Sequence, residues 1–465
     1  MMITEKKLDI IVKAVLILVA SMVFGAILYF QPFYGLMDDA NLLYSFMPKV
    51  LKNGFFYSAW EYATDDINWG MFRLIYPMMI YFLYSIAMKF GIVTFFLINA
   101  FSVFFIYGLN ALILGRILKI KAIYILVFSA TFFYAYDLFQ HPSLQEKLIM
   151  LFGAPLLYFA ASKELGYWKK FFGITLFTVL GVLSKASFCI YIGVAFVALL
   201  SSMQGQWNKK NLFLLFYLFL LDLLCVGFLA WVSTKGNYTT EHYSVTKVGE
   251  NLKSFAGVLF LVPLILGFVF FFRIDNLKSK IEIFIPLVGV LAFLVIFLPW
   301  GIAAYIQTVI VPLYSALAVQ ILGKIFPEKR KALWLLPLCA LALSVAGYRA
   351  YGSFHRLADL REIITRAAEL KNVGVNELEM SCSEGAGSMT QFFGNIAGVK
   401  IIAHPRSSWT DTAALDTKIA LFDKALCPLP GKLSMLPNCT GEVFYSSSFK
   451  RGFQIVKFHC PPTKQ

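Results

Sequence analysis

The chain has 465 residues, of which 59% are hydrophobic and only 14% are charged, and its mean hydropathy is +0.72. This composition excludes an ordinary soluble globular protein and predicts an integral membrane protein that crosses the bilayer many times. The formal net charge of +15 does not call for a nucleic-acid partner, because the lysines and arginines of membrane proteins collect in cytoplasmic loops and at headgroup level.

The N-terminal part has a basic start and then an apolar run from Ile10 to Phe30, without a convincing small-residue cleavage site. It predicts a retained first span that enters from the cytoplasm. Residues 31–73 follow as a polar and aromatic loop on the far side. Trp60 and Trp69 in this loop suit helices that lie along the membrane surface.

The lengths of the apolar runs after residue 73 decide which of them cross the membrane, since a hydrocarbon core about 30 Å thick needs roughly 20 apolar residues per helix. The run 74–90 is short and predicts a tilted or interfacial helix. With 92–115 as the second span, the later basic loops fall in the cytoplasm, whereas a crossing at 74–90 would invert most of them. The bundle then has about eleven transmembrane helices. The stretch 171–202, with Lys185 in its middle, predicts a hairpin of two short helices.

The composition changes near Gly352, which predicts an all-α polytopic membrane bundle over 1–351 and a small α/β domain over 352–465. The last span, about 332–348, is expected to deliver this domain to the far side of the membrane. The expected elements are helices at 354–371, 388–397 and 412–426, and strands at 376–382, 398–404, 441–447 and 452–459, the last two joined by a turn at Lys450-Arg451-Gly452.

The cysteines divide between the two parts. Three lie in apolar runs, and an even set of four lies in the polar tail, which indicates two disulfides and an oxidising compartment. The tail cysteines allow three pairings, among which the sequence does not choose. They are Cys382, Cys427, Cys439 and Cys460.

Two acidic pairs in the loop 31–73 are the strongest candidates for chemistry. Asp38 and Asp39 stand in the stretch Met37-Asp38-Asp39-Ala40, where the first helix meets water, and a carboxylate at such a boundary suits a general base or a metal ligand. Asp65 and Asp66 come later in the loop and are followed by Arg73. A solvated acidic loop is the alternative interpretation of Asp38 and Asp39 taken alone.

Further polar side chains recur on the predicted outer side where solubility does not require them. Cationic groups at this level would suit a lipid-linked phosphate, although each residue by itself fits ordinary interfacial placement. The indication of a binding site is that all of them are predicted on the same side of the membrane. They are Asp137, Gln140, His141, Gln145, Glu146 and Lys147 in one loop, Lys185 in the helical hairpin, and Lys235, His242 and Lys247 in another loop.

The arrangement resembles the GT-C superfamily of membrane glycosyltransferases. The likeness rests on a first helix, a long outer loop that begins with an acidic motif, interfacial helices, the Leu183-Ser184-Lys185 hairpin and a C-terminal domain. The loop His141-Pro142-Ser143-Leu144-Gln145-Glu146-Lys147 is similar to the polar outer loop of such enzymes. The nearest members are bacterial enzymes that decorate O-antigen, including phage-type serotype-converting glucosyltransferases. The WWD-type motif of oligosaccharyltransferases is absent.

The resemblance implies a multi-pass protein of the bacterial inner membrane with a cytoplasmic N-terminus and a periplasmic C-terminal domain. It implies transfer of a sugar, such as glucose, from a polyprenyl phosphate, such as undecaprenyl phosphate, to a glycan such as lipopolysaccharide O-antigen, with inversion. The implied roles are general base for Asp38 or Asp39, acceptor or ion orientation for Asp65 or Asp66, acceptor loop for His141 and Glu146, and donor-phosphate binding for Arg73, Lys147, Lys185 and His242. Any Mg²⁺ or Mn²⁺ would bind Asp38 and Asp39.

Three other functions compete with this hypothesis. A flippase or transporter of a lipid-linked sugar would also carry intramembrane charge, but no inverted repeat is visible. An O-antigen polymerase or ligase would share the donor, but we would expect a large arginine-bearing outer loop late in the bundle. A purely structural membrane protein would not need the acidic loop.

Overall fold

The computed structural model describes the helices and strands of the chain and some of their connections. The chain forms two compact units. One unit comprises residues 1–25, 54–83 and 97–350, and the other comprises 26–53, 84–96 and 351–465. The described residues are 4–32, 46–68, 71–203, 207–235, 248, 255–274, 276–297, 306–326, 330–372, 374–375, 377–381, 400–404, 419–423, 440–446 and 453–459.

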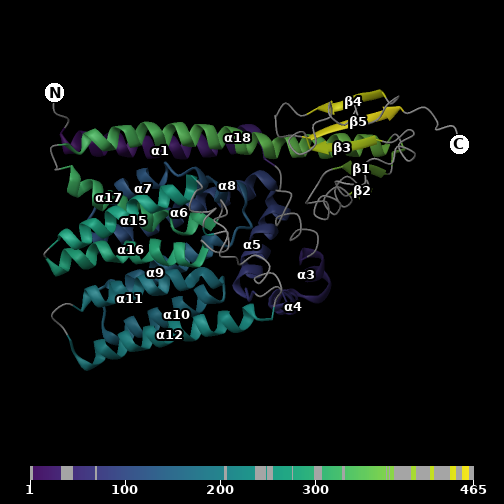
Figure 1. Cartoon of the computed structure of the whole chain (residues 1–465). Coiled ribbons are helices and arrows are strands. Elements are labelled where there is room, and N and C mark those ends of the chain that lie inside the picture. The colour runs from purple at the N-terminus through teal and green to yellow at the C-terminus, as the bar shows by residue number, and fades with distance from the viewer. Residues whose placement is uncertain are drawn as a thin grey trace. The chain divides into compact units, whose positions relative to one another are not determined.

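Helices make up nearly all of the described chain up to residue 372 (Figure 1). Their bounds are α1 Glu5–Phe30, α3 Met47–Asn53, α4 Phe55–Ile67, α5 Ile75–Phe90, α6 Ile92–Leu118, α7 Ala122–Ser129, η2 Phe133–Tyr136, α8 Asp137–Gln140, α9 Glu146–Ala161, α10 Tyr167–Val182, η3 Ala186–Phe188, α11 Cys189–Ser202, α12 Lys209–Ser233, α15 Phe255–Arg273, α16 Leu277–Phe297, η4 Ile306–Val309, α17 Val311–Ile325 and α18 Ala332–Asn372.

The interior of the larger unit is built around α9, α11 and α17, whose side chains are buried along most of their length. Such helices are apolar on every side because each is surrounded by other helices. Glycines allow close approach in this region: a Cβ at Gly153 would lie 2.2 Å from the ring of Tyr191, and one at Gly181 would lie 2.2 Å from the ring of Phe188. Small residues at helix contacts serve the same purpose in membrane bundles generally.

The helices confirm the predicted helical membrane bundle. Five described helices are long and apolar enough to cross a bilayer, and a sixth candidate is the pair α7 with η2–α8, which bends by 88°. The apolar helices α5, α11 and α17 are shorter than 18 residues. The predicted count of about eleven spans therefore stays a prediction, as does the interfacial placement of α5. The expected hairpin at 171–202 is confirmed as α10 and α11.

The end of the last span differs from the prediction. We expected one helix at 332–348 and a separate one at 354–371, but a single 41-residue helix, α18, covers both. Gly352 does not interrupt it, because a glycine inside a helix costs only about 1 kcal/mol. The predicted domain boundary after residue 351 thus falls inside this helix, and the division of the chain at that point stays a prediction.

The strands of the C-terminal part form one mixed sheet in the order β2-β1-β3-β5-β4. The parallel strands β1 and β2 and the antiparallel pair β4 and β5 confirm the expected strands. The helix expected at 412–426 is wrong over 419–423, where β3 pairs with β1 and β5, since a short apolar run fits either structure by pattern alone. The predicted helix 388–397 and the turn 450–452 lie outside the described residues. The strands are β1 Glu377–Ser381, β2 Lys400–His404, β3 Ile419–Asp423, β4 Thr440–Ser446 and β5 Phe453–His459.

Candidate functional site

The first charged pair of the site joins the end of α4 to the segment that follows it. Arg73 donates from Nε to Oδ2 of Asp66 and from Nη2 to Oδ1, both over 2.7 Å. The guanidinium also lies 5.4 Å from the ring of Tyr76 and 6.0 Å from that of Tyr62. The Arg73 and Asp66 side chains are only 13% and 9% exposed. A bidentate, partly desolvated pair of this kind holds the arginine in one orientation.

The surroundings of this pair shift the pKa values of both residues. Burial raises the pKa of the Asp66 carboxyl, against the hydrogen bonds and charge of Arg73. Burial alone would lower the pKa of Arg73, but the hydrogen bonds and charge of Asp66 raise it above its usual value. Arg73 therefore stays a cation. Asp65, the neighbouring carboxylate, is exposed.

A second pair links Lys185, just after α10, to Glu146, the first residue of α9. The Lys185 side chain is 19% exposed, whereas that of Glu146 is 1% exposed. The backbone N–H of Ile75 donates to the carbonyl of Leu183 over 3.0 Å. Ile75 is two residues from Arg73, and Leu183 is two residues from Lys185. This bond therefore places Arg73 and Lys185 close together.

Lys147, next to Glu146, points into the protein. Its amine donates to Oδ1 of Asn99 over 2.6 Å and to the carbonyl of Pro142. Asn99 in turn donates to the carbonyl of Leu138 over 2.8 Å. Lys147 is 3% exposed and Asn99 is fully buried, so Lys147 helps to hold the loop before α9. Asn99 was missed by the sequence prediction, although an amide inside the apolar run 92–115 was a signal.

The third pair joins α8 to α18. Arg349 donates from Nη2 to Oδ1 of Asp137, and its guanidinium lies 3.9 Å from the ring centroid of Phe133. The backbone N–H of His141, a half-buried residue, donates to the carbonyl of Asp137. Arg349 was also missed by the sequence prediction. Its signal was an arginine at the end of the last apolar run.

These contacts form one continuous set, here called the polar belt. It lies within the larger unit. Four buried polar atoms in this region have no hydrogen-bond partner in the described part of the chain: Gln140 Nε2, Gln145 Oε1, Glu146 Oε2 and Arg349 Nε. Buried groups of this kind normally bind water or a ligand. The belt residues are Asp66, Arg73, Asn99, Asp137, Glu146, Lys147, Lys185 and Arg349.

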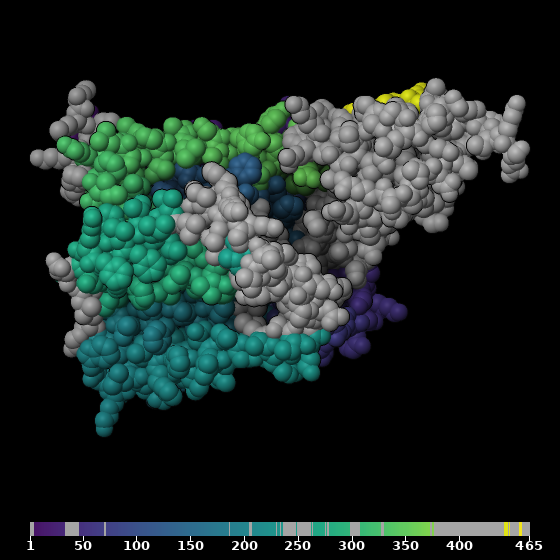
Figure 2. Space-filling model, in the orientation of Figure 1, coloured from purple at the N-terminus to yellow at the C-terminus, as the bar shows by residue number. Residues whose placement is uncertain are grey.

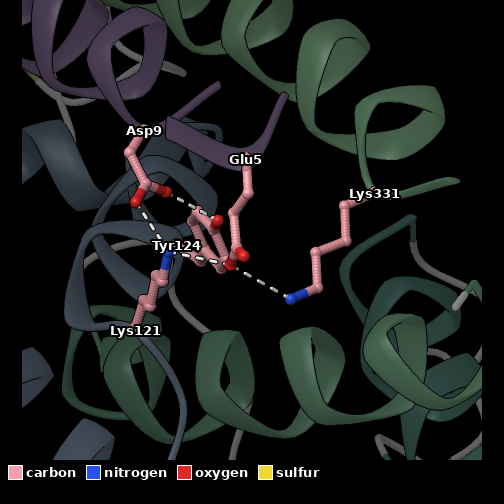
Figure 3. Close-up of polar contacts among 5 residues, drawn as sticks. All are labelled: Glu5, Asp9, Lys121, Tyr124 and Lys331. Atoms are coloured by element: carbon pink, nitrogen blue, oxygen red, sulfur yellow. Dashed lines mark hydrogen bonds and ion pairs between the residues drawn. The ribbon is translucent and has the colours of Figure 1, made fainter. Parts of the chain in front are cut away.

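A second polar network lies where α18 begins (Figure 3). Lys121 donates to Asp9 over 2.6 Å and pairs with Glu5 over 2.9 Å, while Lys331 reaches Glu5 over 3.5 Å and Tyr124 donates to Asp9 over 2.8 Å. This network ties the start of α1 to the segments that precede α7 and α18.

The helix between the two polar regions gives their separation. Lys331 directly precedes α18, and Arg349 lies eighteen residues further along the chain. At a rise of 1.5 Å per residue the separation is about 27 Å, close to the thickness of a hydrocarbon core. The belt and the network of Figure 3 therefore lie at opposite ends of the membrane-spanning helices.

The remaining predicted site residues are not brought into the belt by the described structure. Asp38, Asp39 and His242 lie outside the described residues, as do the four tail cysteines. Among the residues that the structure describes, no group of three or more His, Cys, Asp or Glu side chains is arranged to hold a metal ion. Binding of Mg²⁺ or Mn²⁺ by Asp38 and Asp39 stays a prediction.

The chain resembles solved structures, whereas no protein-family model and no curated protein sequence matches it. The crystal structure of ArnT from Cupriavidus metallidurans bound to undecaprenyl phosphate matches with a TM-score of 0.50 and 11% identity, over 97% of both chains. The apo structure of the same protein gives 0.43 and 10%, over 82% of this chain and 87% of the other. The chain is thus a multi-pass membrane protein with a fold similar to that of ArnT over nearly its whole length.

Proposed function

We propose that this chain is a glycosyltransferase of the GT-C type, which transfers a sugar from a polyprenyl phosphate to an acceptor at the membrane surface. The polar belt is the observation that carries the proposal, because it combines paired cations with buried polar atoms that have no hydrogen-bond partner among the described residues. Cations bind a lipid phosphate, and hydrogen-bond donors and acceptors bind the hydroxyls of a sugar. The similar fold of ArnT, crystallised with undecaprenyl phosphate, supports the choice of donor.

Arg73 and Lys185 are the proposed phosphate-binding groups of the belt. Each is held by a carboxylate and each keeps some exposure, 13% for Arg73 and 19% for Lys185. As the bond between the anomeric carbon and the phosphate oxygen breaks, negative charge develops on the phosphate. Preorganised cations stabilise that charge. Lys147 and His242 keep their proposed phosphate roles, Lys147 through the loop that it holds.

The carboxylates of the outer loop divide into two proposed roles. Both oxygens of Asp66 accept hydrogen bonds from Arg73, so Asp66 serves to orient that cation. Asp65 is exposed and is the proposed group for the acceptor. Asp38 or Asp39 is the proposed general base: it takes the proton of the acceptor hydroxyl, whose oxygen attacks the anomeric carbon from the face opposite the phosphate. The products are the inverted glycoside and polyprenyl phosphate.

The finer parts of the proposal follow from the GT-C resemblance. The sugar is a hexose such as glucose, the donor lipid is undecaprenyl phosphate, and the acceptor is a glycan such as lipopolysaccharide O-antigen, contacted by the loop of His141 and Glu146. The protein lies in the bacterial inner membrane, with its N-terminus in the cytoplasm. The part beyond residue 351 is periplasmic, and two disulfides link its four cysteines.

A transfer assay tests the proposal. Membranes that contain the chain are given a panel of labelled sugars on polyprenyl phosphate, and label is followed into polysaccharide. We expect transfer by the wild type and by Glu164→Ala, a control at an exposed carboxylate near the start of α10, but none by the double variant Asp38→Ala, Asp39→Ala. If no donor in the panel supports transfer while the lipid still moves between leaflets, the chain is a flippase and the proposal fails.

A further inference from the structure

One carboxylate of the polar belt has an oxygen to which no donor in the described part of the chain binds. Glu146, the first residue of α9, has a side chain that is only 1% exposed. Its Oε1 accepts a hydrogen bond from the amine of Lys185, whereas its Oε2 is buried and has no hydrogen-bond partner among the described residues. A buried acceptor without a donor is costly, so such an oxygen normally binds water or a ligand.

The carboxylate of Glu146 is held in place from both sides. Lys147, the next residue, donates to the carbonyl of Pro142 and so fixes the first turn of α9. The backbone N–H of Lys185 donates to the carbonyl of Gly181 over 3.1 Å and fixes the turn after α10. The helices α9 and α10 pack against each other, and α12 lies beyond α10 along the lower edge of the larger unit in Figures 1 and 2. Oε2 therefore has the fixed position that a binding group requires.

The chemistry of Oε2 limits what it can bind. An ionised carboxylate only accepts hydrogen bonds, so its ligand must offer an O–H or N–H group. In a sugar linked to polyprenyl phosphate, the phosphate diester carries a negative charge and no hydrogen, and the prenyl chain is a hydrocarbon. The hydroxyls of the sugar are the part of such a donor that can bind to Glu146.

The contact with Lys185 indicates which hydroxyl this is. Lys185 is proposed above to bind the donor phosphate, and it contacts the other oxygen of the same carboxylate. A ligand group at Oε2 therefore lies next to the phosphate. The phosphate is attached to the anomeric carbon, and the neighbouring ring carbon carries the 2-hydroxyl, which is the hydroxyl nearest to the phosphate.

We propose that Oε2 of Glu146 accepts a hydrogen bond from the 2-hydroxyl of the donor sugar, which makes Glu146 a specificity-determining residue. This inference rests on the proposed glycosyltransferase function. It places the carboxylate between the donor sugar and the acceptor that the same loop is proposed to contact. A site that binds a substrate hydroxyl discriminates strongly against an analogue without it, because the buried protein group then stays unpaired.

Binding of donor analogues to the full chain in detergent tests the contact. The protein is titrated with polyprenyl-phosphate glucose, with its 2-deoxyglucose analogue and with polyprenyl phosphate alone, and the bound fraction is measured by native mass spectrometry. Initial transfer rates are measured with the same two sugar lipids.

The variant is Glu146→Gln, which keeps the shape of the side chain. Since a lysine amine only donates hydrogen bonds, the carbonyl oxygen of the new glutamine stays with Lys185, and its amide nitrogen takes the place of Oε2. Glu282→Gln is the matched control. Its carboxylate also lies beside a lysine, Lys119, over 4.0 Å, but at the other end of the bundle.

We expect the wild type to bind the glucose lipid about tenfold more tightly than the 2-deoxyglucose lipid, the scale of one hydrogen bond to a charged group. Glu146→Gln should lose this preference and still bind polyprenyl phosphate like the wild type. Glu282→Gln should keep the preference.

Equal binding of the two sugar lipids by the wild type would overturn the contact, and this measurement needs no variant. An undiminished preference in Glu146→Gln, or an equal loss of preference in Glu282→Gln, would overturn it as well. If Glu146→Gln weakens binding of polyprenyl phosphate as much as that of the glucose lipid, Glu146 only orients Lys185 and the inference fails. A wild type that shows the preference in binding but transfers no sugar would refute the proposed function and leave the contact standing.

Discussion

Replacing either charged residue of the Asp66–Arg73 pair should lower the stability of the protein far more than the loss of a surface ion pair does. The pair has two hydrogen bonds of 2.7 Å, and its side chains are 13% and 9% exposed. Removal of one partner from a buried pair typically costs about 3–5 kcal/mol, because the other charge remains buried without compensation. We therefore expect Asp66→Asn and Arg73→Met each to lower the unfolding free energy by about 3 kcal/mol.

A double-mutant cycle separates this coupling from the effects of the single changes. The double variant Asp66→Asn, Arg73→Met removes both charges, so its loss should fall short of the sum of the two single losses by at least about 2 kcal/mol. The unfolding free energy is measured by tryptophan fluorescence as mixed micelles are titrated with a denaturing detergent.

The chain supplies its own control in Arg366 and Glu369. Their ion pair has a similar distance, 2.8 Å, but its side chains are 44% and 47% exposed. The same cycle on this pair should give about 0.3–0.5 kcal/mol. If the Asp66 and Arg73 losses are additive and each is below about 1 kcal/mol, the pair is solvated and our reasoning about the belt is wrong.

Three further predictions test the packing and the topology. Asn99→Leu removes the acceptor of the Lys147 amine and should cost about 1–3 kcal/mol, measured by the same unfolding titration, whereas Asn99→Asp should cost less because it keeps an acceptor. Gly181→Ala would place a methyl group 2.2 Å from the Phe188 ring and should lower the unfolding free energy by about 1–3 kcal/mol, while an unchanged value would mean that α10 and η3 pack loosely. If the tail is periplasmic, its cysteines should resist thiol labelling until they are reduced, and labelling without reductant would contradict that topology. The cysteines concerned are Cys382, Cys427, Cys439 and Cys460.

The sequence predicted the elements that depend on local pattern. The apolar runs gave the helical membrane bundle, and Lys185 in the middle of 171–202 gave the α10–α11 hairpin, because a lysine is costly at the centre of a span. Alternation of apolar residues gave β4 and β5. It did not distinguish a strand from a helix at β3, whose central place in the sheet is set by partners distant in the chain.

The candidate site was predictable only in part, for a similar reason. Asp66 and Arg73 are seven residues apart, so a shared loop already indicated that they face one compartment. Glu146 and Lys185 were both named, but not as partners, since 39 residues separate them. Arg349 pairs with Asp137, which lies 212 residues earlier in the chain. No local pattern encodes such a contact, which arises when the bundle packs.

The most direct test of the central claim, that the polar belt serves a lipid-phosphate sugar donor, is a transfer measurement on a belt variant. Wild type, Lys185→Met and the control Lys119→Met are reconstituted in liposomes with labelled undecaprenyl-phosphate hexose and acceptor glycan, and initial rates are compared at equal amounts of folded protein. We expect transfer by the wild type and the control, and a rate about 100-fold or more lower for Lys185→Met, the scale on which single stabilising groups act. Equal rates for all three proteins would contradict this claim.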